Sequence, residues 1–155
     1  MSPDLRHAES DADLLACFPL MRVLRPHLTD AETFAARVRR QAEAGYRLLA
    51  AWDGGAPVGL AGYRPQENLI RGPFCYVDDL VVAEAVRRTG LGAVLLDAVG
   101  AEARASGLPY LVLDTALDNT LGQRFYFRYG MLPAALRFAM PLTGRDPAPR
   151  TGSGQ

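Results

Sequence analysis

The chain has 155 residues, 49% of them apolar, which is enough for one well-buried core and too short for two comfortable domains. Its 17 cationic side chains are all arginines and are balanced by 17 acidic ones, so no net field attracts DNA, RNA or an anionic membrane surface. These numbers predict a single domain and exclude bulk binding of nucleic acid.

The sequence shows neither a targeting segment nor a metal-binding pattern. Residues 1–7 lack an apolar signal core, and no stretch approaches the roughly 20 apolar residues of a membrane span. We therefore expect a cytoplasmic protein without a membrane partner. Cys17 and Cys75 have no C-x-x-C spacing, and only two histidines could join them at a metal, so no metal site is expected.

The amino-terminal third predicts a strand followed by two helices. Residues 5–9 alternate like a short strand, and Ser10 then caps a helix. Thr29 and Glu32 have the spacing of a capping box, which starts a second helix. Gly45 is placed to end that helix in a left-handed conformation.

The next segment predicts an antiparallel hairpin and a further strand. The apolar segments 46–52 and 56–63 are joined by Asp53-Gly54-Gly55, which is a tight-turn sequence. Residues 64–73 are polar and irregular, which predicts a loop, and residues 74–83 predict another strand. The alternation of that strand places four side chains on one face: Tyr76, Asp78, Leu80 and Val82.

The second half predicts helix, strand, helix and strand. Residues 90–106 form a helix whose leucines face the sheet, and residues 110–115 form a strand parallel to the preceding one through a right-handed crossover. The following helix is capped at residue 119 or 120. Residues 134–142 predict a final strand, and the Pro-, Gly- and Ser-rich tail, residues 143–155, is expected to be disordered.

A glycine loop, Arg87-Arg88-Thr89-Gly90-Leu91-Gly92, joins the strand 74–83 to the helix that follows. The first amides of a helix have no partner within it and lie at the positive end of its dipole, so such a junction binds anions. Gly90 and Gly92 remove the side chains that would hold a pyrophosphate away from the backbone. The loop matches neither G-x-G-x-x-G nor a loop ending in G-K-[ST], and a chain without lysine excludes the triphosphate interpretation.

Two spaced motifs resemble one family. Tyr76-Val77-Asp78-Asp79-Leu80-Val81-Val82 precedes Arg87-x-x-Gly90-x-Gly92, and residues 119–131 look like the N-x-x-A-x-x-F-Y-x-x-x-G-F segment of the GCN5-related N-acetyltransferase (GNAT) family. The resemblance covers residues 5–142, including the order of the predicted elements. The departures from the family pattern are Arg88, Thr89, Gly122 and Met131.

The resemblance implies an α+β, three-layer fold, with a mixed and mostly antiparallel sheet flanked by helices in one domain over residues 1–142, and an acetyl-coenzyme A site. The pyrophosphate would lie on the amides of residues 88–93 and the pantetheine arm along residues 80–82. That arm requires the strands around Leu80 and Leu113 to splay apart, for which a bulge is the expected device. The residues assigned to the cofactor are Leu80, Val81, Val82, Arg87, Arg88, Thr89, Gly90, Leu91, Gly92, Ala93 and Asn119.

The resemblance also implies the catalytic roles. Tyr126 would be the general acid, since a phenol with a pKa of about 10 stays protonated at neutral pH, and a plain packing role is its alternative. Asp78 would receive the ammonium proton, directly or through water, or orient the amine. Asp79 competes with it, because two residues that alternate across a strand cannot both face the acceptor. Asp79 and Asp114 are assigned to acceptor binding, with arginine pairing or loop anchoring as the alternatives, and Asn119 would cap its helix as well as contact the cofactor arm.

The implied reaction is acetyl transfer from acetyl-coenzyme A, as a co-substrate and without a metal, to an amine of a small molecule or a peptide. A catalytically silent acyl-coenzyme A sensor or interaction module of the same fold is the alternative. Homodimers are frequent among look-alikes, but no segment of this sequence specifies an interface.

Overall fold

A computed structural model of the chain describes residues 2–144, and the chain divides after Leu113 into two compact units, which we describe separately. Over its described residues, 114–144, the second unit holds one helix, α4 (Thr120–Tyr129). The first unit holds all the remaining elements, which are β1 (Asp4–His7), α1 (Asp11–Leu24), α2 (Ala31–Ala42), β2 (Arg47–Asp53), β3 (Ala56–Asn68), β4 (Gly72–Val82), the 3₁₀ turn η1 (Glu84–Val86), α3 (Leu91–Ala105) and β5 (Leu111–Leu113).

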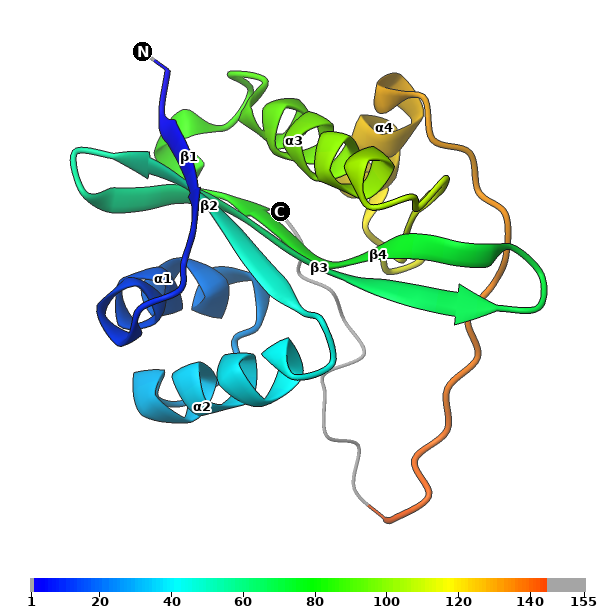
Figure 1. The fold of residues 1–155 in the computed structure, drawn as a ribbon, viewed down its shortest axis with the longest axis horizontal. Coiled ribbons are helices and arrows are strands. Elements are labelled where there is room, and N and C mark those ends of the chain that lie inside the picture. Colours follow the sequence, from blue (N-terminus) through cyan, green and yellow to red (C-terminus); the bar gives the residue numbers. More distant parts are fainter. Residues whose placement is uncertain (1, 145–155) are drawn as a thin grey trace. The chain divides into compact units, whose positions relative to one another are not determined.

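The first unit is built around a five-stranded sheet in which the strands follow one another in sequence order. The pairs β1–β2, β2–β3 and β3–β4 are antiparallel, whereas β4 and β5 are parallel and are connected through α3. Helices α1 and α2 lie on one side of this sheet and α3 on the other (Figure 1). The expected three-layer fold with a mixed, mostly antiparallel sheet is therefore confirmed.

Side-chain caps start both amino-terminal helices. Ser10 accepts a hydrogen bond from the amide of Asp13 (3.1 Å), as its position predicted. The second helix is capped by Asp30, whose carboxylate accepts from the amide of Thr33 (2.8 Å). The expected capping box at Thr29 is wrong, because the carboxylate one residue later reaches the first turn and the Thr29 hydroxyl only donates to it (3.4 Å).

Two glycines form the turn between β2 and β3. Gly54 and Gly55 have φ angles of +57° and +86°, and Asp53 pairs with Ala56 across the turn, which confirms the expected hairpin. The loop expected over residues 64–73 is wrong, since this segment completes a long β3–β4 hairpin. Its polar composition resembled a loop because a two-stranded arm can be exposed on both faces and then needs no apolar alternation.

The tip of the β3–β4 hairpin is closed by an asparagine. The side-chain oxygen of Asn68 accepts hydrogen bonds from the amides of Ile70 (3.0 Å) and Arg71 (2.8 Å), and Gly72 follows with φ +70°. This turn leaves the large apolar side chains of Leu69 and Ile70 exposed.

A bulge interrupts the pairing of β3 with β4. Tyr63 pairs with Val77 and Gly62 pairs with Asp79, so Asp78 is an extra residue that faces no partner in the ladder. One added residue reverses the alternation of all side chains that follow it. The bulge therefore separates β4 into two segments of opposite phase.

The phase change corrects the expected face of β4. Asp78 precedes the phase change and accepts a hydrogen bond from Arg64, which also donates one to the side chain of Gln41 in α2. Leu80 and Val82 follow it, and Val82 pairs with Gly59, which lies under two leucines of α3. Asp78 and Leu80 thus face opposite sides of the sheet, because the extra residue reverses the alternation between them.

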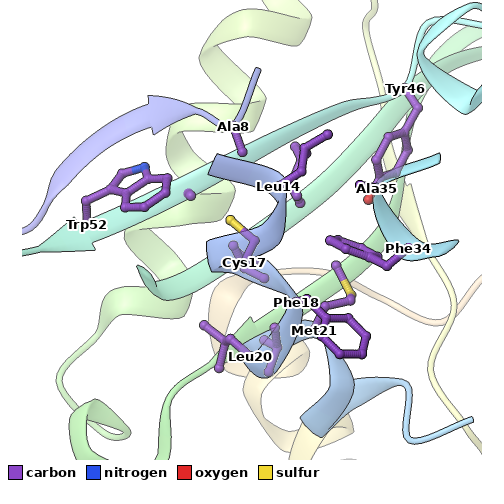
Figure 2. Close-up of a cluster of buried hydrophobic side chains, with 14 residues drawn as sticks. Ala8, Leu14, Cys17, Phe18, Leu20, Met21, Phe34, Ala35, Tyr46 and Trp52 are labelled. Carbon is purple, nitrogen blue, oxygen red and sulfur yellow. The ribbon is translucent and has the colours of Figure 1, made fainter. Parts of the chain in front are cut away.

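Two apolar layers hold the first unit together. Between the sheet and α1–α2, buried side chains such as Leu14, Cys17, Met21 and Phe34 form the cluster shown in Figure 2. On the opposite face, the buried side chains of α3 are Leu91, Leu95, Leu96, Val99 and Ala103. The leucines of α3 face the sheet as expected, whereas Val94 is exposed.

A polar cluster fastens the far end of α3 to the sheet. The Glu102 carboxylate accepts a hydrogen bond from the hydroxyl of Tyr63, forms an ion pair with Arg47 (3.2 Å) and lies 3.2 Å from the Nε2 of His7. The His7 ring also contacts the Tyr63 hydroxyl (2.8 Å). Burial lowers the pKa of His7 while Glu102 acts to raise it, so the imidazole is a satisfied structural group rather than a free one.

In the second unit, Asn119 caps α4 by accepting from the amide of Gly122 (3.0 Å), and Gly130 ends the helix with φ +102°. The strand expected over residues 134–142 is wrong, since these residues have no regular structure. Their alternation provides an apolar face, but a strand also requires a partner for its backbone groups. The tail expected to be disordered lies mostly outside the described residues, which end at 144.

Gly62 offers a direct test of the packing at the bulge. A Cβ at this position would overlap the Tyr46 hydroxyl, so Gly62→Ala should lower the free energy of unfolding by about 2 kcal/mol or more. Gly100→Ala is the matched control, because its Cβ would meet only the tip of Arg104 at 3.8 Å and should add about 0.5–1 kcal/mol in a helix. Urea unfolding measures both, and equal stabilities of the two variants would contradict the packing described.

Candidate functional site

The amino terminus of α3 presents unpaired amides. Its N-cap is Gly90, with φ +86° and no side-chain cap, and the first amide bonded within the helix is that of Val94, which donates to the carbonyl of Gly90 (3.1 Å). The amides of Leu91, Gly92 and Ala93 consequently have no partner inside the helix. Together with the helix dipole they provide the donors that an anion requires.

The loop before α3 adopts a conformation that the sequence did not predict. Arg88 has φ +64°, the only non-glycine residue with a positive φ among residues 2–144, whereas Gly92 lies within the first turn of the helix. The Thr89 hydroxyl donates to the carbonyl of Val86 (2.6 Å) and closes the loop. A left-handed conformation costs an ordinary residue about 1–2 kcal/mol, so the loop is strained at Arg88.

The loop is open on its outer side. Arg88, Thr89 and Gly90 are exposed, and a Cβ built on Gly90 would meet no atom within 4 Å. The Nε of Arg87 donates to the carbonyl of Val82 (3.4 Å) and so links the loop to the end of β4. Space for a ligand therefore lies directly outside the helix terminus.

The edge of β4 next to this loop is not covered by β5. Pairing with β5 is confined to Cys75–Val77, so the segment 78–82 has no β5 partner. The amide of Ala83 donates to the carbonyl of Val58 in β3 (2.8 Å), and because backbone groups alternate along a strand, Leu80 and Val82 direct theirs to the open edge. The expected bulge is confirmed, whereas the expected splay stays a prediction, because β5 ends at Leu113, opposite Val77.

The two carboxylates at the bulge are held differently. Asp78 accepts from the Nε of Arg64 (2.9 Å), and burial raises its pKa while Arg64 opposes this rise. Asp79 accepts from the Nε of Arg25 (3.0 Å) and from the hydroxyl of Tyr46 (2.8 Å). The expectation that the two acids point to opposite faces is wrong, because the bulge lets both bond side chains on the α1–α2 side.

The partners of these acids were missed by the sequence interpretation. Arg25 follows the last turn of α1, Tyr46 immediately precedes β2 and Arg64 lies in β3, so no short motif contains them. The available signal was Gly62 inside an apolar strand, since such a glycine often marks a bulge or a close approach. Burial raises the pKa of Tyr46 well above its ordinary value, so its hydroxyl acts only as a hydrogen-bonding group.

The remaining predicted residues belong to the second unit. Tyr126 lies half-buried in α4 with its ring edge-on to Phe125, the two centroids being 5.2 Å apart. Asp114 forms an ion pair with Arg137 (2.5 Å). Asn119 is the helix cap and also donates to the hydroxyl of Thr115 (3.0 Å).

Residues 2–144 lack two further kinds of feature. Within this range no three His, Cys, Asp or Glu side chains gather where they could hold a metal ion. None of the described helices is both long enough and apolar enough to cross a bilayer.

Comparison with known proteins assigns the chain to a family. The model of the acetyltransferase (GNAT) family matches residues 12–131. The chain belongs to this family. It is 31% identical over 124 residues to the N-acetyltransferase YhdJ of Bacillus subtilis (strain 168), a match that covers 79% of this chain and 86% of YhdJ.

Solved structures of GNAT proteins share the fold. AAC(6')-Iy in complex with the bisubstrate analogue CoA-S-monomethyl-acetylneamine superposes with a TM-score of 0.79 at 20% identity, covering 91% of this chain and 99% of that one. Ribosomal-protein-alanine N-acetyltransferase from Brucella melitensis biovar Abortus 2308 superposes with a TM-score of 0.76 at 18% identity, covering 90% and 99%. At these identities the likeness concerns the fold.

The strain at Arg88 predicts an unusual gain of stability. Arg88→Gly removes the left-handed penalty, and after the entropic cost of glycine about 0.5–1 kcal/mol should remain, which corresponds to ~2 °C in Tm. Arg88→Gln is the matched control, because it removes the charge but keeps a side chain at φ +64°. Calorimetric melts that place the glycine variant at or below the glutamine variant would exclude strain at this position.

Proposed function

We propose that this GNAT protein transfers the acetyl group of acetyl-coenzyme A to an amine nitrogen. The observation that carries the proposal is that an uncapped helix terminus at Gly90 follows a strand edge, residues 78–82, that β5 does not pair. One element suits a diphosphate and the other suits an extended chain with amide groups. Coenzyme A contains both parts in one molecule.

The fit to coenzyme A rests on backbone groups. The amides of Leu91, Gly92 and Ala93 would donate hydrogen bonds to the pyrophosphate, and Arg87, Arg88 and Thr89 would lie around it. Leu80 and Val82 would pair with the pantetheine arm as with an added strand, while Val81 keeps its bonds to β3. Asn119 would contact the arm in addition to capping α4. When bound, acetyl-coenzyme A supplies the activated thioester.

The chain's own groups would handle the protons. A new C–N bond forms as the acceptor nitrogen attacks the thioester carbon, and the C–S bond breaks. Asp78 would take the proton that the nitrogen loses, directly or through water, and a backbone amide of residues 80–82 would polarise the carbonyl oxygen. Tyr126 would give its phenolic proton to the leaving thiolate, so the step balances without another reactant.

The acceptor is proposed to be an amine of a small molecule or a peptide, with Asp79 and Asp114 as candidate contacts. AAC(6')-Iy is an aminoglycoside N-acetyltransferase, which supports the first class, and the ribosomal-protein-alanine N-acetyltransferase supports the second. Both acids already bond arginines, Arg25 and Arg137 respectively. Any acceptor contact with them therefore competes with an existing ion pair.

A second function is favoured by one observation. Asp78 is already paired with Arg64, with both side chains 22% exposed, and a paired carboxylate is a poorer base than a free one. A sensor that binds acyl-coenzyme A without turnover would retain the loop and the open strand edge. Thiol release from acetyl-coenzyme A with a panel of small amines and peptide amino termini separates the two functions, because only the enzyme releases thiol in an amine-dependent way.

Tyr126→Phe tests the general acid. Turnover should fall about 100-fold, because the thiolate then leaves without a proton, while the affinity for coenzyme A stays within about twofold. Tyr110→Phe is the control, since it removes a phenol that is 46% exposed and stacked on Arg71. Steady-state thiol release and calorimetric titration give both quantities, and unchanged turnover in the Tyr126 variant would remove this residue from its role.

The proposed role of Asp78 as the base predicts a pH dependence of kcat/KM. Only the ionised carboxylate can take a proton, so kcat/KM should increase as the pH rises through the pKa of Asp78, which burial places above the ordinary aspartate value. In Asp78→Asn this limb of the profile should vanish and kcat/KM should fall about 100-fold at neutral pH. Asp11→Asn, at a side chain that is 73% exposed, serves as the control. A variant at Asp78 that keeps the wild-type profile would exclude it as the base.

A further inference from the structure

The bulge in β4 leaves a main-chain carbonyl without a ladder partner, and an arginine from another element satisfies it. Asp78 is the extra residue of the bulge. Its carbonyl accepts from an Nη of Arg25 (2.7 Å), and the Nε of the same guanidinium donates to the carboxylate of Asp79 (3.0 Å). Through these two hydrogen bonds, the planar guanidinium holds two successive residues of β4.

The carboxylate of Asp79 is also held by a second hydrogen bond. The second oxygen of Asp79 accepts from the hydroxyl of Tyr46 (2.8 Å), whose side chain is buried. Gly62 makes this contact feasible, because a Cβ there would overlap the Tyr46 hydroxyl and lie 2.7 Å from the Asp79 carboxylate. The guanidinium, the carboxylate and the phenol therefore form one connected network that joins β4 to the residue after α1 and to the residue before β2.

We infer that Arg25, Asp79 and Tyr46 are positioning residues that fix the bulge of β4 and thereby aim the backbone groups of Leu80 and Val82 at the open edge. This inference rests on the proposed function, because the open edge is where the cofactor arm would pair. It assigns Asp79 to the support of the strand rather than to the acceptor. None of the three residues touches a reacting atom in this scheme.

The geometry explains why an arginine is required. A carbonyl and a carboxylate on adjacent residues need two donors held at a fixed spacing in one plane, which a guanidinium provides and an ammonium does not. Only 15% of the Asp79 side chain is exposed, so removing one partner leaves a poorly solvated charge. Loss of the network would let the extra residue relax and shift the register of the residues that follow it.

The test compares Arg25→Met, Arg25→Lys and Tyr46→Phe in the full chain with a matched control, Arg39→Met. Arg39 also pairs with an aspartate, Asp11, at 2.5 Å, but that pair is exposed. The measurements are Tm, kcat and KM for acetyl-coenzyme A, and hydrogen exchange of the Asp79 and Val81 amides in the cofactor-free protein. Exchange of the Ala50 amide in β2, which β3 separates from β4, serves as the internal reference.

The Arg25→Met and Tyr46→Phe variants should raise KM about tenfold with kcat within about twofold, and exchange at Asp79 and Val81 should accelerate relative to Ala50. The lysine variant should not restore KM, and the Arg39 control should behave as wild type. A fall in Tm alone, with KM and relative exchange unchanged, or full rescue by lysine, would reduce the network to ordinary structural support and overturn the inference.

Failure of this inference can be told apart from failure of the proposed function. If the wild-type protein neither binds coenzyme A nor releases thiol, the proposed function is wrong whatever the variants do. The exchange measurement uses no cofactor and still reports whether Arg25 and Tyr46 hold the bulge. If that exchange is unchanged in an active enzyme, only the positioning role is lost.

Discussion

The extra residue in β4 is the constraint on which the rest of the site depends. Directly before it, at Cys75–Val77, β4 is paired on both edges, with β3 and with β5, and after it the strand is paired only with β3. Because the phase reverses at Asp78, the same strand offers polar side chains to the α1–α2 layer and apolar ones to α3 within a few residues. A regular strand would keep one alternation throughout, and nothing in its backbone would interrupt its pairing with a neighbouring strand.

Helix α3, which follows β4, must keep a fixed position, because its amino-terminal amides can bind an anion only if they stay in place. Gly59 lets two leucines of α3 pack directly against β3, and Glu102 ties the other end of the helix to three strands through His7, Tyr63 and Arg47. An apolar contact and a polar one thus fix α3 at two separated points. The strain at Arg88 lies in the short connection between these two rigid parts, where a loop of fixed length has to join them.

Much of this architecture could be predicted because its causes are local. A pair of glycines that tolerate positive φ specifies the turn at residues 54–55, and Ser10 and Asn119 each start a helix by accepting a hydrogen bond from an amide three residues later. The glycine loop was predicted for the same reason. The position of the bulge and the left-handed Arg88 were not, because both result from the fit of one element to another. The strand predicted over residues 134–142 was wrong for a similar reason, because alternation indicates an apolar face but does not supply a partner strand.

The two neighbouring acids show how that fit divides similar side chains between tasks. Asp79 has both oxygens engaged, by a guanidinium that also holds the backbone and by a phenol whose own ionisation burial suppresses. Asp78 has one arginine partner, and burial raises its pKa above the ordinary aspartate value. When the environments of two carboxylates differ in this way, the less stabilised one is the better candidate for proton transfer. Asp79 then serves the reaction best by staying where it is, because the strand that carries Asp78 and the open edge is held through it.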